Sequence, residues 1–183
     1  MTLTKQNTEE LIVLCKAKNQ YAQLEIYNRY YDAMYNTALR IVKDSFNAED
    51  IMQDAFLLAF TKLDTLKDSN TFGAWLKRIV INKSIYHFNK NKKENTTPLD
   101  NMLYKIADND GITSDYEYTT LQAQQVVKVM HTLKDNYRIA LSLHLIEGYD
   151  YEEISQIMSI TYANCRTTIS RAKESLRSKM HAL

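Results

Sequence analysis

The sequence predicts an all-α protein with two small helical domains, joined by an acidic flexible linker, the second of which contains a helix-turn-helix. Three observations carry this prediction. The 183 residues include only three Gly and one Pro, fewer than folds built from strands and turns require. Apolar residues recur at spacings of three and four, which is the helical period. The composition also changes sharply at Glu94, in the middle of the chain.

The first two helices are predicted from a cap and from apolar periodicity. Thr8 can cap a first helix, with Glu9 and Glu10 in its first turn, where acidic side chains favour the helix dipole. A longer apolar pattern of tyrosines and aliphatic residues then predicts a second helix over about 20–42.

Two further helices complete the first domain, residues 1–93. Asn47 is expected to start the third helix, with acidic residues in its first turn. A polar loop, residues 64–70, follows it. Thr71 is the candidate cap of a fourth helix over 72–93.

The middle segment, residues 94–114, is predicted to be a linker with one short helical turn near 99–106. It holds the only Pro and one of the three Gly, and it opens an acidic stretch that continues to Glu117 with six acids against one Lys. The second domain is therefore expected to span 115–183.

The second domain is predicted to end in two helices separated by a tight turn. Its first helix is followed by one that stops at Gly148, a residue suited to the position after a helix. Asp150 and Glu153 have the spacing of a capping box. Thr161 is the candidate cap of the final helix, which ends near Met180.

Composition limits the possible functions. The net charge of +1 and the pI of about 7.7 are lower than is common for nucleic-acid binders, so any basic surface must be local. Cys15 and Cys165 are far apart and suggest neither a disulfide framework nor a zinc site.

The sequence has no recognisable phosphate loop, nucleophile motif or metal-ligand spacing, so we expect neither an enzyme nor a cofactor. Without a signal core or a membrane-length apolar run, we expect a cytoplasmic protein with no membrane insertion.

Residues 148–179 have the layout of a DNA-reading helix-turn-helix, in which early residues of the second helix enter the major groove. Arg can read guanine, Asn can read adenine, and Thr offers a hydroxyl or a methyl group. The candidate base readers are Ala163, Asn164, Arg166, Thr167 and Thr168, and the candidate phosphate contacts are Arg171, Lys173, Arg177 and Lys179. A helical hairpin with a solvated basic face is the alternative.

The fourth helix offers a second candidate surface for nucleic acid. From Trp75 to Lys93 it has six Lys or Arg and no acid, and it contains the aromatic residues Trp75, Tyr86 and Phe88. Cations can hold phosphates while flat rings stack on unpaired bases. The alternative for Trp75 is a place in the core.

Two long stretches resemble one known family. "LEIYNRYYDAMYNTALRIVKDSFNAEDIMQDAFLLAF" followed by "FGAWLKRIVINKSI" resembles the second conserved region of extracytoplasmic-function (ECF) sigma factors, a subgroup of the sigma-70 family of bacterial RNA polymerase sigma factors. "LKDNYRIALSLHLIEGYDYEEISQIMSITYANCRTTISRAKESLR" resembles the fourth region. The order and the gap between them also fit this subgroup, which lacks the third region.

The resemblance implies a set of partners and site residues. The partners would be core RNA polymerase, through its largest-subunit clamp and its flap, promoter DNA as duplex and as melted single strand, and an anti-sigma factor. The clamp contact would involve Asp50, Gln53 and Asp54. Melting of the minus-ten element would involve Lys67, Asn70, Trp75, Lys77, Arg78, Asn82 and Lys83. The minus-thirty-five element would be read by Asn164, Arg166, Thr167, Thr168, Arg171 and Lys173, while the acidic linker would run near the RNA exit path.

The sequence departs from the family pattern at some of these positions. Ile81, Tyr86 and His87 stand where many relatives have basic residues, and the pair Thr167–Thr168 stands where Ser-Arg is common. Base specificity therefore does not transfer from relatives, and binding to free DNA is expected to be weak.

Two other functions remain open at this point. A stand-alone helix-turn-helix regulator would dimerise on a palindromic duplex. A non-DNA adaptor would use a tyrosine-rich face formed by Tyr21, Tyr27, Tyr30, Tyr31 and Tyr35, although these rings also suit core packing.

Overall fold

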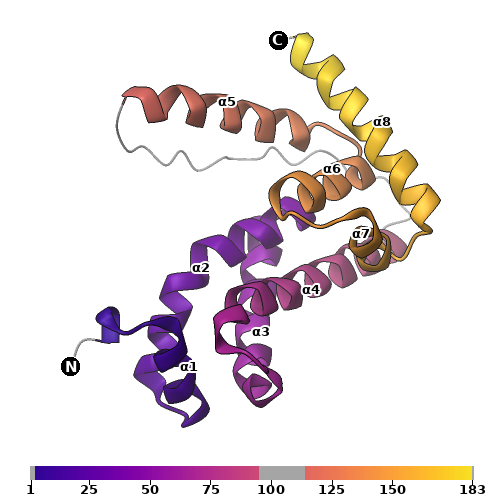
Figure 1. The fold of residues 1–183 in the computed structure, drawn as a ribbon. Helices are drawn as coiled ribbons and strands as arrows, with labels where there is room; N and C mark the ends of the chain where they lie inside the picture. The colour runs from indigo at the N-terminus through magenta and orange to yellow at the C-terminus, as the bar shows by residue number, and fades with distance from the viewer. Residues whose placement is uncertain (1–2, 95–113, 183) are drawn as a thin grey trace. The chain divides into compact units, whose positions relative to one another are not determined.

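Every regular element in the residues that the computed structural model describes, 3–94 and 114–182, is a helix or a helical turn (Figure 1). This confirms the predicted all-α class with two helical domains. Contacts divide the chain into two compact units, residues 1–91 and 92–183, and each is described by itself. Most of the predicted linker, with its short helical turn, lies outside the described residues. Within those residues, every helix is too short or too polar to cross a membrane.

The first unit is built around α2. Its elements are a 3-10 turn (Leu3–Lys5), α1 (Thr8–Lys16), α2 (Gln20–Val42), α3 (Ser45–Thr61), two further 3-10 turns (Leu63–Thr65 and Ser69–Thr71) and α4 (Phe72–Glu94). Helix α2 packs against α1 and α3 (Figure 1). The predicted range 20–42 is confirmed, because the Asn19 side chain accepts from the Ala22 N–H at 3.1 Å and Lys43 ends the helix in a left-handed conformation.

Two predicted helix starts were wrong by one or two residues. The cap of α1 is Asn7, whose side chain accepts from the Glu10 N–H, and Thr8 is already helical. Helix α3 begins at Ser45 with Asp44 as its cap, so Asn47 lies inside its first turn. In both places an extra polar residue upstream has the extended backbone and the side-chain oxygen that a cap needs.

Helix α4 is held against α2 at its first turn. Phe72 is fully buried, and its ring meets Tyr30 edge-on at 5.3 Å between centroids. The next residue, Gly73, allows this approach, because a Cβ there would lie 2.9 Å from Cε1 of Tyr30. Thr71 was predicted to cap α4; its hydroxyl instead donates to the Asp68 carbonyl at 2.8 Å in the preceding 3-10 turn.

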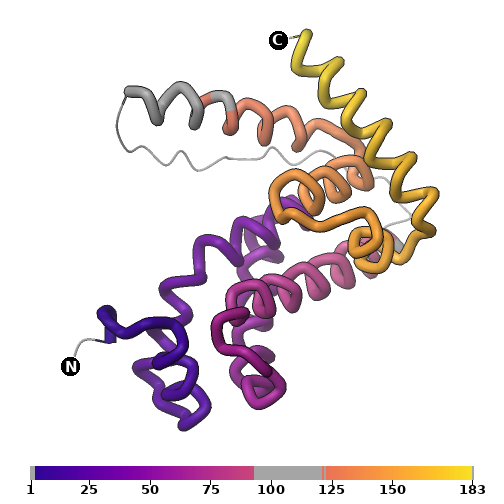
Figure 2. Tube along the Cα trace, viewed as in Figure 1, coloured from indigo at the N-terminus to yellow at the C-terminus, as the bar shows by residue number. Residues whose placement is uncertain are grey.

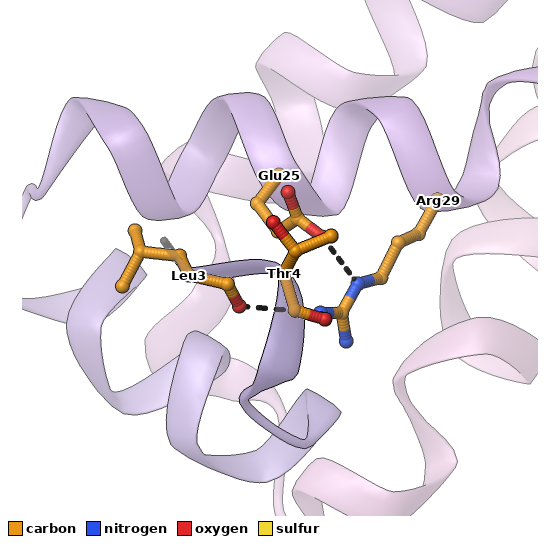
Figure 3. Close-up of polar contacts among 4 residues, drawn as sticks. All are labelled: Leu3, Thr4, Glu25 and Arg29. Carbon is orange, nitrogen blue, oxygen red and sulfur yellow. Dashed lines mark hydrogen bonds and ion pairs between the residues drawn. The ribbon is translucent and has the colours of Figure 1, made fainter. Parts of the chain in front are cut away.

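The first residues of the chain are fastened to α2 by one arginine. Nε of Arg29 donates to Oε1 of Glu25, one helical turn earlier, at 2.8 Å. Figure 3 shows the same guanidinium reaching the backbone of Leu3 and Thr4, where Nη2 donates to the carbonyl oxygens at 3.4 and 3.1 Å. Arg29 therefore donates hydrogen bonds to both α2 and the N-terminal 3-10 turn, and it holds that turn against the helix.

The second unit packs its helices around α8. Its elements are α5 (Ser114–His131), α6 (Asp135–Leu141), a π-helical turn (Ser142–Ile146), α7 (Tyr151–Met158) and α8 (Tyr162–His181). Helix α8 contacts α5, α6 and α7, and the chain passes from α7 into α8 through a tight turn (Figure 2). Arg138 is buried within α6, where its Nη2 donates to Oδ1 of Asp135 at 3.0 Å.

The helix before Gly148 is less regular than predicted. After Leu141 the backbone widens into the π-helical turn, which periodicity alone does not signal. The predicted role of Gly148 is confirmed, since it follows the last helical residues with a φ of +79° that suits glycine.

The capping box predicted at the start of α7 is confirmed: the Glu153 N–H donates to Asp150 at 2.8 Å, and the Asp150 N–H donates to Glu153 at 3.1 Å. Thr161 caps α8 as predicted.

Replacing Asp150 with alanine is expected to destabilise the second unit by about 1–2 kcal/mol, because α7 has only eight residues and depends on its cap. Urea unfolding of the full chain, followed by circular dichroism, measures the loss. Asp150→Asn is the matched control, since its side-chain oxygen still accepts from the helix. Equal stability of the alanine variant and the native chain would show that the cap contributes nothing.

Candidate polymerase and promoter interfaces

Helix α3 presents one polar face and one core face. Ile51, Met52 and Ala55 are buried, because they fall on the side that packs against α2. The three residues predicted to contact polymerase, Asp50, Gln53 and Asp54, are all exposed. Within the helix, Nε2 of Gln53 donates to Oε1 of Glu49 at 3.2 Å, which adds a further carboxylate to this face.

Two large apolar side chains extend the exposed face of α3. Phe46 lies four residues before Asp50, and Leu57 lies four residues after Gln53, so all four share one side of the helix. Phe46 is 73% exposed and Leu57 is 66% exposed. The face is therefore polar and acidic at its centre and apolar at both ends, a composition that fits a protein partner.

One contact joins the predicted polymerase face to the predicted promoter face. Nζ of Lys83, on α4, lies 3.1 Å from Oδ2 of Asp54, on α3. The sequence placed these residues in separate sites, and nothing in the local pattern of either helix signals their contact. The Asp54 side chain is 67% exposed, so the ion pair contributes no more than about 1 kcal/mol and exchanges readily.

The segment before α4 is folded closely onto the core. Leu63 and Leu66 are buried and anchor it. The side chain of Asp68 accepts from the backbone N–H of Asn70 at 2.9 Å. The predicted DNA contacts Lys67 and Asn70 are both exposed, so this anchored loop presents them to solvent.

The predicted promoter residues on α4 differ in how exposed their side chains are. Arg78 and Asn82 are exposed, whereas Lys77 and Lys83 are half-buried. Trp75 is half-buried against the core, and its ring lies 6.0 Å from that of Phe72 between centroids. Part of the Trp75 ring therefore packs in the core, as the alternative reading of this residue predicted, and the rest is open to solvent. Among the predicted promoter residues on α4, Arg78 and Asn82 therefore have the most exposed side chains.

Helix α8 likewise has one buried side and one exposed side. Cys165, Ile169 and Ala172 are buried. The predicted reading residues Asn164, Arg166, Thr167 and Arg171 are exposed. The Thr167 hydroxyl donates to the Ala163 carbonyl at 2.9 Å, so its methyl group and its acceptor lone pairs remain for DNA.

Thr168 does not share this exposed face. It is only 9% exposed, because it precedes Ile169 by one residue and Ala172 by four, which turns it toward the packed side of α8. The sequence prediction grouped it with Thr167 as a base reader. Its burial removes it from the set of residues that a DNA edge could reach.

Two lysines of α8 are engaged within the second unit. Nζ of Lys173, which is half-buried, lies 3.2 Å from Nε2 of His144 in the π-helical turn. The other ring nitrogen of His144 lies 3.1 Å from the Tyr149 carbonyl, so we assign its proton to Nδ1 and leave Nε2 to accept from lysine. Lys179 donates to the carbonyl and the hydroxyl of Thr132 at 3.1 and 3.0 Å. Both lysines therefore help to hold α8 in place, a role that sequence reasoning missed.

The tyrosine-rich face is mostly interior. Tyr27, Tyr30, Tyr31 and Tyr35 are partly buried against the core cluster, as the packing alternative predicted. Tyr21 is the exception, with 78% of its surface exposed. These residues therefore do not form one continuous aromatic surface for an adaptor.

Both cysteines are buried and free. Burial raises the pKa of the Cys15 thiol to about 11 and also raises the pKa of Cys165. Because the thiolate is the reactive form, both side chains are protonated and behave as small apolar groups near neutral pH.

Comparison with known proteins places both units in one family. Residues 26–94 match Sigma-70 region 2, and residues 123–176 match Sigma-70, region 4. The ECF RNA polymerase sigma factor SigM of Bacillus subtilis is 31% identical over 153 residues, covering 84% of this chain and 91% of that protein. SigW of the same organism is 28% identical over 178 residues, covering 92% and 94%.

The fold agrees with this placement. The sigma factor RpoE of Bartonella quintana, solved with the anti-sigma factor NepR, superposes with a TM-score of 0.59 at 20% identity over 86% of this chain and 95% of RpoE. The two Sigma-70 regions, in their order along one chain, and the match to SigM carry the conclusion. The chain belongs to the ECF sigma factors of the sigma-70 family, which direct the initiation of transcription.

Proposed function

We propose that the protein binds core RNA polymerase and directs promoter-specific initiation through three separate helical faces. Helix α3 docks on the clamp of the largest subunit, residues 64–89 capture the melted minus-ten element, and α8 reads the minus-thirty-five element in duplex DNA. The observation that carries the proposal is the pair of Sigma-70 regions in one chain, each with exposed polar residues at positions predicted to meet a partner.

In this proposal the polymerase contact is electrostatic at its centre. The exposed carboxylates of Asp50 and Asp54 attract basic side chains on the clamp, while Phe46 and Leu57 pack at the two ends. The charges steer the encounter and fix the register, and the apolar ends provide area that is removed from water. The second domain would contact the flap, which positions α8 on the upstream DNA.

Binding energy, rather than a catalytic step, would open the promoter. Extruding a base from the duplex costs a few kcal/mol, which stacking and hydrogen bonding on the protein offset. We assign this work to the exposed residues of the loop and α4, chiefly Asn70, Arg78 and Asn82, with Lys67 on phosphate. Phosphoryl transfer belongs to polymerase, so the protein itself acts as a non-enzymatic factor in the cytoplasm.

Two domains on one chain would act together at a promoter. We assign residues 1–93 to the region 2 domain and 115–183 to the region 4 domain, with the acidic segment 94–114 between them and near the RNA exit path. Tethering raises the effective concentration of the second domain once the first is bound. RpoE was solved with an anti-sigma factor, and by analogy we propose that an anti-sigma factor also regulates this chain.

Run-off transcription with core polymerase and genomic promoter fragments tests the proposal. We expect products that require both core enzyme and this protein, together with a core complex that is detectable by sedimentation. No promoter-dependent product and no core complex would refute it. Tight binding of a dimer to a palindromic duplex without polymerase would instead favour a stand-alone regulator.

Arg166 is expected to determine base preference in the upstream element. It is exposed on the second turn of α8, where a guanidinium can donate two hydrogen bonds to guanine. Arg166→Ala should weaken binding of the holoenzyme to the preferred sequence by about 1–3 kcal/mol and relax selection at one base pair. Binding to a panel of single-base variants of the mapped promoter measures this effect.

Arg177→Ala is the matched control, because Arg177 is also exposed but lies about three turns further along α8. If it contacts phosphate, its loss should lower affinity evenly over the panel and reduce the salt dependence. An equally even loss for Arg166→Ala would show that Arg166 contacts phosphate and does not read a base.

A further inference from the structure

A lysine on the same side of α8 as Arg166 is held by a histidine from another element. Lys173 follows Arg166 by seven residues, close to two helical turns, so the two residues share one side of the helix. Arg166 is exposed, whereas Lys173 is half-buried and its Nζ lies 3.2 Å from Nε2 of His144 in the π-helical turn. The position of Lys173 along α8 suits a phosphate contact, yet its ammonium group is engaged within the second unit.

The contact between Lys173 and His144 requires a neutral imidazole. Nδ1 of His144 lies 3.1 Å from the Tyr149 carbonyl oxygen, which can only accept, so Nδ1 carries the proton of the neutral ring. Nε2 then has a lone pair, to which the Lys173 ammonium donates. A second proton on the ring would occupy that lone pair and place two cations against each other. Protonation of His144 must therefore open the contact.

The charged groups around the imidazole come from several elements. A hollow beside the ring is lined by residues from the starts of α7 and α8: Asp150, Tyr151, Glu152 and Tyr162. The nearest elements along the chain carry Asp135 and Arg138, which bind each other in α6 at 3.0 Å, and Glu147 at the end of the π-helical turn. The carboxylates attract a cationic ring, whereas Lys173 repels it. Because Lys173 is the cation in contact with Nε2, it is the group that a second proton displaces.

We propose that His144 is a positioning residue that retains Lys173 while the imidazole is neutral and releases it to a phosphate of the upstream element when the imidazole is protonated. The inference rests on the proposed reading of the minus-thirty-five element by α8. Histidine ordinarily changes charge between about pH 5 and 8, so affinity for the upstream element should rise as the pH falls through this range. By linkage, the complex with DNA favours the protonated ring, and binding takes up a proton.

The test measures the affinity of holoenzyme, formed from core polymerase and the full chain, for a duplex that carries the mapped minus-thirty-five element. Measurements at about pH 6 and about pH 8 lie on either side of the ordinary titration of histidine. The native protein should bind about two- to tenfold more tightly at the lower pH, the range of one hydrogen bond. The slope of affinity against salt should also steepen there by about one, since one more phosphate is contacted.

Two substitutions separate the roles of the histidine and the lysine. His144→Gln keeps an oxygen that can accept from Lys173 but does not titrate, so it should bind at the lower pH no better than at the higher. Lys173→Gln should also lose the response to pH, because it leaves no ammonium group to release. Both variants should bind core polymerase as the native chain does, which shows that they are folded.

The matched control is His181→Gln, which removes an exposed histidine from the end of α8. It should respond to pH as the native chain does, and it provides the reference for the response of polymerase itself. An equal response in His144→Gln would overturn the proposal, because the response would then belong to other groups.

Two further results would also contradict the release of Lys173. A response that persists in Lys173→Gln would mean that His144 acts without the lysine. Tighter binding at the higher pH would mean that the closed contact itself favours DNA. In each of these cases run-off transcription by the native protein would still support the proposed function, whose own failure is the absence of any product.

Discussion

If α3 docks on polymerase as proposed, replacing Asp50 and Asp54 together with lysine is expected to weaken binding to core polymerase by about tenfold or more, since the reversed charges would repel a basic partner surface. Both carboxylates are exposed, so the fold should survive. The Asp54 change also removes the ion pair with Lys83, at a stability cost below about 1 kcal/mol. Titration of fluorescently labelled protein with core polymerase at two salt concentrations measures the effect, which should shrink as salt rises.

Two controls separate docking from general charge effects. Asp32→Lys alters an exposed acid on a different helix, α2, and should leave core affinity near the native value. Asp54→Asn removes one charge without reversing it and should give an intermediate loss. Unchanged core affinity in the double lysine variant would mean that α3 is not the docking face.

Truncating Phe72 to alanine is expected to destabilise the first unit by about 3–5 kcal/mol, the usual cost of removing a buried phenylalanine. The ring is fully buried, and its centroid lies 5.3 Å from that of Tyr30 and 6.0 Å from that of Trp75. Because it anchors the first turn of α4, its loss should also impair promoter opening. Urea unfolding of the full chain measures the stability, and Phe72→Leu should lose less because it leaves a smaller cavity.

Phe46→Ala is the matched control for this substitution. It removes the same side chain from a position that is 73% exposed, and it should change stability little. If Phe46 contacts polymerase, that variant should lose core affinity while remaining folded. Comparable losses of stability in the two variants would contradict the assignment of Phe72 as the anchor.

Periodicity predicted the helices well because burial repeats with the helical turn. The bounds of α2 match the prediction, and the face of α3 that carries Asp50 is exposed as expected. Cap residues are harder to predict than helices. Asn7 and Thr8 both have a side-chain oxygen that can cap α1, and only the backbone angles show that Asn7 is the cap. Thr168 was misplaced because its residue type suggested a polar face, although its position beside Ile169 indicated the inner one.

Contacts between helices were beyond sequence reasoning. The pairing of Lys83 with Asp54 depends on how α3 lies against α4, and each helix alone leaves that undetermined. The π-helical turn is similar: the stretch reads as one continuous helix, yet the backbone widens and brings His144 to Lys173, 29 residues further along the chain. Such contacts arise from tertiary packing, which local propensity does not encode.

The division of α8 into a packed side and an open side bears on how promoter preference could be reprogrammed. Substitutions at Asn164, Arg166 and Thr167 change only side chains that face outward, so a randomised library at these positions should yield mostly folded proteins with new recognition. Position 168 tolerates only residues that fit its enclosed site. If α8 reads the promoter as proposed, DNA preference could change through its outward-facing side chains while the packed side of the same helix keeps the scaffold.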